Sequence, residues 1–500
     1  MLYLLEKRSR SAWLTPAAAA MLMAAIGGCG NNGALPAKTS AEGFSAKILA
    51  NLNLAIIDDP DLAASISTLL GEWKAQTGSE LTVQMLTAKN IAATEKLDAD
   101  AVIYPSALLG TLAEQHLIRP LNGAWLKDDP LETADLLQPP NSLEFTWDGQ
   151  PFAVPLGSPQ FVLLYRPNLF QRFGKQPPRT WEEYQQLAGF FNNLQSLRKQ
   201  ANPQEEDAAP LVFVEPWSGA VEPLAPGWAA RMLLARAAAY AKHRDYFSVL
   251  FDRETMEPLI AGPPFVRALT QLVVAAKSEP KDATSLTPAN AARLLLTGHA
   301  AMAITWPSAA VQIAGEAVPV AFANLPGATE AYNPRHAAYE PRRPDEAVSV
   351  PLRGISGRVG SVVRGTNSPE AAFQLLTWLT SKRWSSQVLP PSSATALFRD
   401  SQLDDPQLWS GQALSTAEAR QYGDVLATAL HQTDVVWMPR IPGEAEYVAA
   451  LDEAVKAAID GKKSPQQALD ESAAQWKQIT AKLGVDQQLE AYRRSLKTAP

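Results

Sequence analysis

The chain has 500 residues, more than one ordinary domain of about 100–200 residues, which predicts two or three domains. Hydrophobic residues make up 46% and charged residues 19%, a globular composition that excludes a largely disordered or repeat-built protein. The net charge of −7 excludes a dominant basic surface, so nucleic acid is not expected as a partner, nor an anionic membrane face as the main one.

The amino-terminal 28 residues have the layout of a secretory signal peptide. The basic residues Lys7, Arg8 and Arg10 precede an apolar, alanine-rich stretch over residues 11–26. This stretch is shorter than the roughly 20 residues that a transmembrane helix needs, so a cleaved signal is favoured over a permanent membrane span. The chain is therefore expected to cross the inner membrane.

The apolar stretch closes with Gly27, Gly28 and Cys29, which resembles the bacterial lipobox. The resemblance implies cleavage before Cys29 and a diacylglycerol on its thiol; an ordinary signal that happens to contain a cysteine is the alternative. Because Cys29 is the only cysteine, disulfides within the chain and multi-cysteine metal sites are excluded. Residues 29–46 are expected to comprise the lipidated cysteine and a flexible tether. Membrane contact is expected through the anchor only, on the periplasmic or extracellular face.

After the tether, strand and helix patterns alternate along the chain. The first strand is followed by Asp59-Pro60-Asp61, which supplies a helix N-cap, a proline at the first helical position and an acid in the first turn. Gly78 ends this helix. Short apolar runs predict strands at 47–57, 80–86, 99–104, 161–165, 211–214, 301–305, 318–322 and 361–363. Apolar residues at three- and four-residue spacing predict helices at 60–77, 107–115, 181–197, 227–242, 264–278, 369–380, 444–460 and 464–483.

Four segments, in the right order, resemble family 1 extracellular solute-binding proteins, the periplasmic group that includes maltose-binding protein. The most specific one is 147–187, with its Tyr-Arg-x-x-Leu-Phe and Thr-Trp-Glu-Glu motifs. The others are 296–307 with Ala-Ala-Met before Trp306, the strand and helix at 360–380, and the terminal helices at 440–468. Together these matches touch most of the chain from Lys47 to Gly484.

The resemblance implies an α/β, two-lobe periplasmic binding protein fold, in which each lobe is a mostly parallel sheet flanked by helices and crossing hinge strands join the lobes. Lobe one is expected to take residues 47–154 and 358–433, and lobe two residues 155–357 and 434–500. The ligand would lie in the cleft between the lobes, which close on it by a hinge motion. The expected partner is the permease of an ATP-binding-cassette (ABC) importer, and the protein is expected to be a monomer.

Ligands of open α/β sheets bind beyond the carboxyl ends of the strands, so candidate ligand contacts follow predicted strands. On this rule the candidates are Asp58, Asp59, Tyr104, Ser106, Gly157, Ser158, Trp217 and Trp306. Trp228 is a further aromatic candidate. Arg353 and Arg358 flank a glycine-rich crossing segment, where their guanidinium groups could bind hydroxyl groups or an anionic ligand. A sugar offers hydroxyl groups at its edge and C–H groups on its faces. The candidate residues supply charged groups that can bind the hydroxyl groups, and aromatic rings that can stack on the C–H faces. For Asp59, a role as the helix N-cap is favoured over contact with the ligand. Weaker candidates are Ser392, Ser393 and Arg440.

The motifs of common enzymes are absent from the sequence. The five histidines are scattered, and no HExxH, G-x-S-x-G, phosphate loop or G-x-G-x-x-G occurs. We therefore expect no catalytic residue, no metal and no cofactor, and the function predicted is capture of a small polar solute, a sugar or oligosaccharide. Two alternatives stay open: an anchored polysaccharide hydrolase that uses two carboxylates, and a sensory or scaffold lipoprotein with a degenerate cleft.

Overall fold

The computed structural model describes residues 50–91, 94–139, 141–200, 211–277 and 283–497. The predicted signal peptide, Cys29 and the tether lie outside the described residues. Residues Ile48–Pro500 form one compact unit. Across the ranges described, none of the helices has both the length and the hydrophobicity that crossing a membrane requires.

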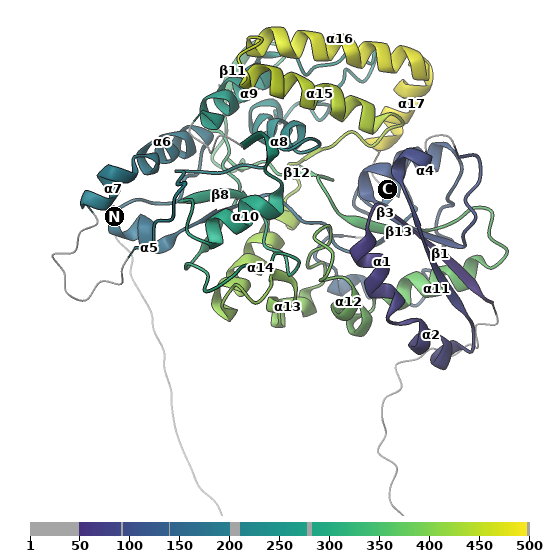
Figure 1. Ribbon diagram of the computed structural model, residues 1–500. Helices are drawn as coiled ribbons and strands as arrows, with labels where there is room; N and C mark the ends of the chain where they lie inside the picture. Colours follow the sequence, from purple (N-terminus) through teal and green to yellow (C-terminus); the bar gives the residue numbers. More distant parts are fainter. Residues whose placement is uncertain (1–49, 92–93, 140, 201–210, 278–282, 498–500) are drawn as a thin grey trace, which may run out of the picture. The chain divides into compact units, whose positions relative to one another are not determined.

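A five-stranded sheet holds the first part of the chain, with the strand order β2-β1-β3-β13-β6 (Figure 1). The strands are β1 (Leu52–Ile57), β2 (Leu81–Leu86), β3 (Ala101–Pro105), β6 (Val154–Pro155) and β13 (Arg358–Val362). β1 pairs in parallel with β2 and β3, whereas β13 runs antiparallel to β3 and β6. Every β1 residue except Asn53 is buried, as expected for a strand covered on both faces.

The predicted cap opens the first helix. Asp59 Oδ1 accepts the backbone N–H of Leu62 at 3.0 Å and starts α1 (Pro60–Ser67). The single helix predicted here is two helices, because Thr68 donates both its backbone N–H and its hydroxyl to Ser65 O and closes a turn. The second, α2 (Leu70–Thr77), ends at Gly78, whose φ of 76° only glycine adopts readily.

A second sheet has the strand order β8-β7-β9, with β7 (Val162–Tyr165) antiparallel to both β8 (Met302–Thr305) and β9 (Ala321–Ala323). Residues Ser218 and Val221 add isolated parallel bridges to the outer side of β8. The strand predicted at 211–214 is wrong: this segment is joined to the chain before β8 by one backbone hydrogen bond, from Val214 to Gly298, and forms no continuous ladder.

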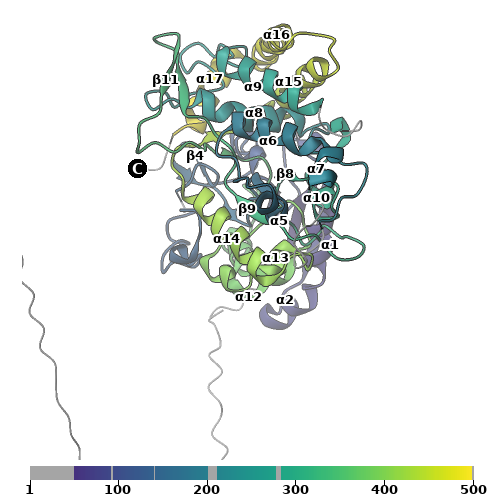
Figure 2. The same cartoon turned by 90° about the vertical axis from the view of Figure 1, so that its left-hand side faces the viewer.

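Helices surround the second sheet on two sides. Figure 1 and Figure 2 both place α15 and α16 beyond α8 and α9 on one side, and α13 and α14 on the other. These helices are α8 (Ala229–Ala241), α9 (Pro263–Ala276), α13 (Gln407–Ser410), α14 (Thr416–His431), α15 (Glu444–Ile459) and α16 (Pro465–Leu483). The predicted 181–197 helix is α6 (Trp181–Asn192), opened by a Thr180 capping box, followed by α7 (Leu194–Gln200).

The remaining elements are short. The helices are α3 (Ala88–Ile91), α4 (Leu109–Glu114), α5 (Pro167–Arg172), α10 (Pro288–Leu296), α11 (Pro369–Thr380), α12 (Lys382–Val388) and α17 (Val485–Ser495). The strands are β4 (Thr146–Trp147), β5 (Gln150–Pro151), β10 (Glu330–Asn333), β11 (Ala338–Pro341), β12 (Leu352–Arg353) and β14 (Val436–Trp437). Four 3₁₀ turns lie at Ser106–Leu108, Thr133–Asp135, Ala283–Ser285 and Asp400–Asp404.

The chain passes between the two sheets several times. It leaves the first sheet after β6, returns between β12 and β13, and leaves again after α12 for α14. α14 is fastened to the second sheet, because Glu418 Oε1 accepts the N–H of Val320 at 2.8 Å and Gln421 Oε1 accepts that of Phe322 at 3.3 Å. The crossing strands β12 and β14 pair with each other in parallel. The predicted lobe boundaries at 154, 357 and 433 stay a prediction.

The buried apolar side chains of both sheets form one connected cluster. This cluster also includes side chains of the surrounding helices and loops, so the two sheets share one continuous hydrophobic core.

The β10–β11 hairpin is clamped to the end of α8 by one carboxylate. The ring nitrogens His336 Nδ1 and His243 Nε2 lie 2.7 and 3.1 Å from the two oxygens of Glu340, and Arg244 and Asn333 donate to the same oxygens. The hydrogen bonds from His336 and His243 lower the pKa of Glu340 to about 2.

This lowered pKa gives the clamp a pH dependence. A carboxylate whose pKa is lower in the folded state stabilises the fold above its unfolded pKa of about 4.3, and the effect is lost as the pH falls toward 2. Wild-type protein should therefore be more stable than Glu340→Gln at pH 7, and the gap between their urea midpoints should close as the pH falls from 4.5 to 2. A gap that stays constant would contradict this role for Glu340.

Candidate ligand-binding site

The first group of predicted site residues forms a buried polar cluster at the end of β1. Asp59 Oδ2 accepts hydrogen bonds from Arg358 Nε at 2.8 Å and from the hydroxyl of Ser392 at 2.7 Å. Arg358 also donates to the backbone oxygen of Asp58 at 3.0 Å. Burial lowers the pKa of Arg358, and the carboxylate of Asp59 partly offsets this effect. Asp59 thus caps α1 with one oxygen, as predicted, and binds Arg358 and Ser392 with the other.

The second group is an aromatic cluster at the end of β8. The rings of Phe161, Trp228 and Trp306 lie 5.5–6.2 Å apart, centroid to centroid, in tilted or edge-on pairs. Trp306 is buried, and Trp228 is partly exposed. The guanidinium group of Arg231 lies 5.3 Å from the Trp228 ring and donates to Ile355 O, on the crossing segment between β12 and β13. This arrangement offers aromatic faces beside a cation.

The loop 390–394 connects these two clusters. Ser392 donates to Asp59 in the polar cluster, and the next residue, Ser393, accepts the indole N–H of Trp306 at 3.2 Å through its backbone oxygen. The structure therefore brings Asp59, Arg358 and Trp306 into one continuous chain of contacts, although they come from different sheets. Ser392 and Ser393, which the sequence offered only as weak candidates, make that connection.

The crossing segments pass beside this chain of contacts at very short range. Gly157 has a φ of 95°, and a Cβ atom there would lie 2.0 Å from Ala396 O. A Cβ atom on Gly357 would lie 2.3 Å from the hydroxyl of Ser158, which donates to the carboxylate of Glu144. Ser106 is buried, and its N–H donates to Gly357 O at 3.2 Å. A cavity of about 10 Å³ beside Gly157 and Ser158 has room for one water molecule at most.

Three other predicted residues make contacts inside the sheets or with a helix. The Tyr104 hydroxyl bonds the Ser361 hydroxyl at 2.7 Å on the neighbouring strand, and burial raises its pKa. Arg353 donates to the last carbonyls of α14, Ala429 O and Leu430 O, and burial lowers its pKa to about 10. The indole N–H of Trp217 donates to Phe191 O at 2.7 Å. Among the described residues, no hydrogen bond or ion pair joins these three side chains to Asp59, Arg358 or Trp306.

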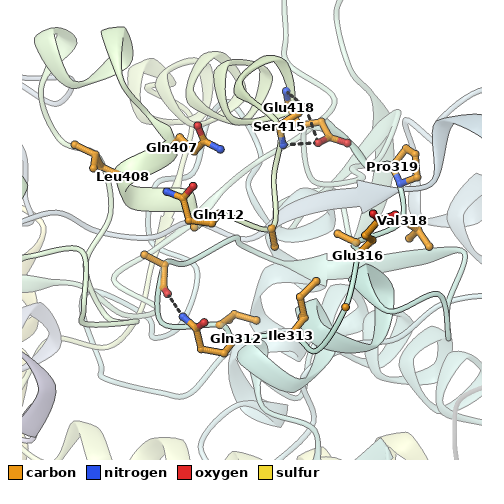
Figure 3. A pocket seen from close by; sticks show the side chains of 16 residues that line it. Gln312, Ile313, Glu316, Val318, Pro319, Gln407, Leu408, Gln412, Ser415 and Glu418 are labelled. Carbon is orange, nitrogen blue, oxygen red and sulfur yellow. Dashed lines mark hydrogen bonds between the residues drawn. The ribbon is translucent and has the colours of Figure 1, made fainter.

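A cavity of about 860 Å³ opens three residues after Trp306. One wall is the loop 309–319, and the facing wall is formed by α13 and the start of α14 (Figure 3). Figure 3 shows Gln312 and Ile313 on the first wall and Gln407 and Gln412 on the second. A hydrogen bond from Ala309 N to Trp409 O, 2.9 Å long, ties the walls together at one end. Two acidic residues, Glu316 and Glu418, also line the cavity, and Glu418 accepts the backbone N–H groups of Ser415 and Val320. Amide and carboxylate groups with apolar neighbours suit a ligand rich in hydroxyl groups.

Phe161 and Arg231 were missed by the sequence prediction. Phe161 begins a predicted buried strand, and Arg231 lies in a predicted helix, so both patterns indicated structural roles only. In the part of the chain that the structure describes, no three His, Cys, Asp or Glu side chains are grouped so that they could hold a metal ion.

Comparison with solved structures shows the same fold in sugar- and polyol-binding proteins. A solute-binding protein of an ABC transporter from Agrobacterium radiobacter K84, solved with ribitol, is 21% identical, with 86% of this chain and 98% of that chain covered and a TM-score of 0.59. The maltose-bound MalE3 of T. maritima is 18% identical over 85% and 99% of the two chains, with a TM-score of 0.60. The sugar-binding MalE of Xanthomonas citri is 16% identical over 87% and 98%, with a TM-score of 0.61. These likenesses confirm the predicted two-lobe α/β fold.

The sequence comparisons identify the family. No curated protein matches the chain. The family model of the bacterial extracellular solute-binding proteins matches residues 72–387, well over half of the chain and including β2, the crossing strand β12 and Trp306. The chain therefore belongs to the family of bacterial extracellular solute-binding proteins.

Proposed function

We propose that this protein captures a neutral sugar or polyol between its two sheets and delivers it to an ABC importer, without chemical change to the solute. The observation that carries the proposal is the chain of contacts that joins Asp59 and Arg358 to Trp306. It sets hydrogen-bonding groups beside aromatic rings, the combination that the edge and the faces of a sugar require. The ribitol and maltose held by proteins of the same fold support this solute class.

The conformation described corresponds to the closed state of a hinged pair of lobes. The contact between Trp306, which follows β8, and Ser393, whose neighbour Ser392 is bonded to Asp59 at the end of β1, joins the two lobes at the strand ends. Solute would enter after the second sheet moves away from the first about the crossing strands β12 and β14, and closure follows if solute binds the closed state better. The cavity beside the loop 309–319 gives longer solutes a place to extend.

The expected location supports the same role. A lipid on Cys29 would hold the protein at the outer face of the inner membrane or at the cell surface, where solute arrives and a permease can be reached. The tether over residues 30–46 would leave the folded part free to dock on that permease as a monomer.

Binding of sugars tests the proposal. Thermal unfolding and calorimetry with neutral sugars and polyols, ribitol, mannitol, maltose and longer oligosaccharides among them, should find at least one that raises the melting temperature and binds saturably. Trp306→Ala should weaken its binding at least tenfold, about 1.4 kcal/mol, because the aromatic surface at the solute face is lost. The control is Trp125→Ala, since Trp125 stacks on Phe373 of α11 and should leave affinity unchanged.

Two outcomes would contradict the proposal. The first is that no sugar or polyol in the panel changes the melting temperature, which would favour a sensory or scaffold lipoprotein. The second is release of reducing ends from glycans incubated with the protein, which would indicate a hydrolase.

A further inference from the structure

A cavity of about 520 Å³ lies away from the Asp59–Trp306 group, at the edge of β9. Three stretches of the chain form most of its walls: the loop before α6, the loop after β9, and the segment that follows β11 and leads to β12. Gln432, directly after α14, completes the lining. Three arginines, Arg179, Arg342 and Arg343, line it together with one acidic residue, Glu346, and Arg179 and Arg343 are exposed. The volume falls within the range of small-molecule sites.

The positive charge in this cavity is not matched by acids. No hydrogen bond or ion pair links the guanidinium group of Arg179 or that of Arg343 to any described residue. Glu346 already faces Arg244 Nη1 at 3.4 Å and Arg342 Nη1 at 4.0 Å. Asp434 lies near Arg342 outside the lining and pairs with Lys242 at 3.9 Å. Two guanidinium groups at the cavity therefore remain available for an anion.

The third guanidinium group is held in place by the backbone. Arg342 donates to Ala328 O at 3.0 Å, to Ala239 O at 2.6 Å and to Lys242 O at 3.3 Å. Carbonyl oxygens orient a guanidinium group but do not neutralise it. Burial lowers the pKa of Arg342, which shows that its charge is less stabilised here than in water.

Backbone hydrogen bonds join the three walls and fix the spacing of the arginines. Gly327 N donates to Arg179 O at 2.9 Å, Ala328 N to Val348 O at 3.1 Å, and Arg342 N to Thr329 O at 2.8 Å. The packing is close, because a Cβ atom on Gly327 would lie 1.9 Å from Val348 O. Prolines 177, 178 and 344 restrict the two outer loops further. The backbone frame of the site is thus in place before any ligand arrives, and a ligand would order the exposed side chains of Arg179 and Arg343.

Neutral hydrogen-bonding groups complete the lining. They are Asn324, Thr329, Ser349 and Gln432. Gln432 Oε1 is buried without a hydrogen-bond partner among the described residues, and an amide can turn to present its NH₂ group instead. Arginine forks match the paired oxygens of phosphate and carboxylate groups, which they bind through two parallel hydrogen bonds.

We propose that this cavity is a second binding site, which takes a small soluble anion with a phosphate or carboxylate group on Arg179, Arg342 and Arg343. It borders the segments that lead into the crossing strands, since Ser349 precedes β12 by three residues and Gln432 precedes β14 by four. An anion bound here would therefore lie next to the hinge. The site is separate from the proposed solute site and does not depend on sugar binding.

Calorimetry of the purified protein with inorganic phosphate and, in a second arm, citrate tests the site, with chloride keeping the ionic strength constant and no sugar present. Saturable binding of either anion is expected, and the double variant Arg179→Gln with Arg343→Gln should weaken it at least tenfold. The matched control is Arg335→Gln, because Arg335 is exposed at the tip of the β10–β11 hairpin and outside the cavity. Its binding should equal that of the wild type.

Three results would overturn the proposal. The first is that neither anion gives a saturable heat of binding. The second is that Arg335→Gln weakens anion binding as much as the double variant does. The third is that neither soluble anion binds, whereas phosphatidylglycerol vesicles bind the wild type and not the double variant. The last result would assign the arginines to a membrane surface. All three leave the sugar measurements untouched, so a failure here is distinguishable from a failure of the proposed solute-binding function.

Discussion

Replacing Arg358 with methionine is expected to lower the free energy of unfolding by about 3–5 kcal/mol, because it leaves the buried carboxylate of Asp59 without its cation. The side chains of Arg358 and Asp59 are 8% and 5% exposed, so solvent screens the pair little. The loss should be measured by urea unfolding at pH 7.

A double variant separates the lost charge pairing from lost packing. Asp59→Asn combined with Arg358→Met removes both charges and keeps a side chain that caps α1 well, so it should be more stable than Arg358→Met alone. A double variant as unstable as the single one would mean that the packing of Arg358, and not its charge, holds the cluster. If Arg358→Met lowered the free energy of unfolding by less than about 1 kcal/mol, the ion pair would be as weak as one exposed to solvent.

Gly157→Ala is expected to destabilise the protein by about 2–4 kcal/mol, from an unfavourable backbone conformation and an overpacked contact. The φ of 95° is one that side chains with a Cβ rarely adopt, and the new methyl group would lie 2.0 Å from Ala396 O. Because the obstructing atom belongs to the backbone, a change of rotamer cannot relieve the clash. Thermal and urea unfolding would measure the loss.

Gly71→Ala is the matched control. Gly71 lies inside α2, and a Cβ atom there meets no atom within 4 Å. It should leave the protein as stable or raise the free energy of unfolding by about 0.5–1 kcal/mol, since alanine loses less backbone entropy in a helix. If both variants had the same effect, the close approach of the crossing segment to Ala396 would not be what makes Gly157 necessary.

Local signals in the sequence predicted individual elements well. The Asp59 cap, the Gly78 stop and the Ser464 start of α16 each depend on hydrogen bonds within four residues, which a sequence displays directly. The strand at 211–214 failed for the opposite reason. Its apolar residues satisfy the pattern, but a strand also needs a partner that runs alongside it, and this segment makes a single backbone–backbone hydrogen bond to the described residues, from Val214 to Gly298.

The candidate site was harder to predict, because the end of a strand indicates where a residue lies in the sheet but not which other residues its side chain contacts. Tyr104 follows the rule for cleft residues, yet its hydroxyl is bonded to Ser361, 257 positions later in the chain. Arg353 was a candidate for binding anions or hydroxyls, and it instead binds the final carbonyls of α14. Both outcomes depend on which distant segment the fold brings near.

The sequence by itself determined the alternation of strands and helices, the family of the chain and the residue types gathered near the strand ends, because burial and capping act over short stretches. Only the tertiary structure decided that the loop 390–394 joins Asp59 to Trp306, and that three arginines from two loops face one cavity. The physical reason is that these contacts join residues between about 90 and 330 positions apart, and the free energy that selects them belongs to the packing of whole sheets and helices.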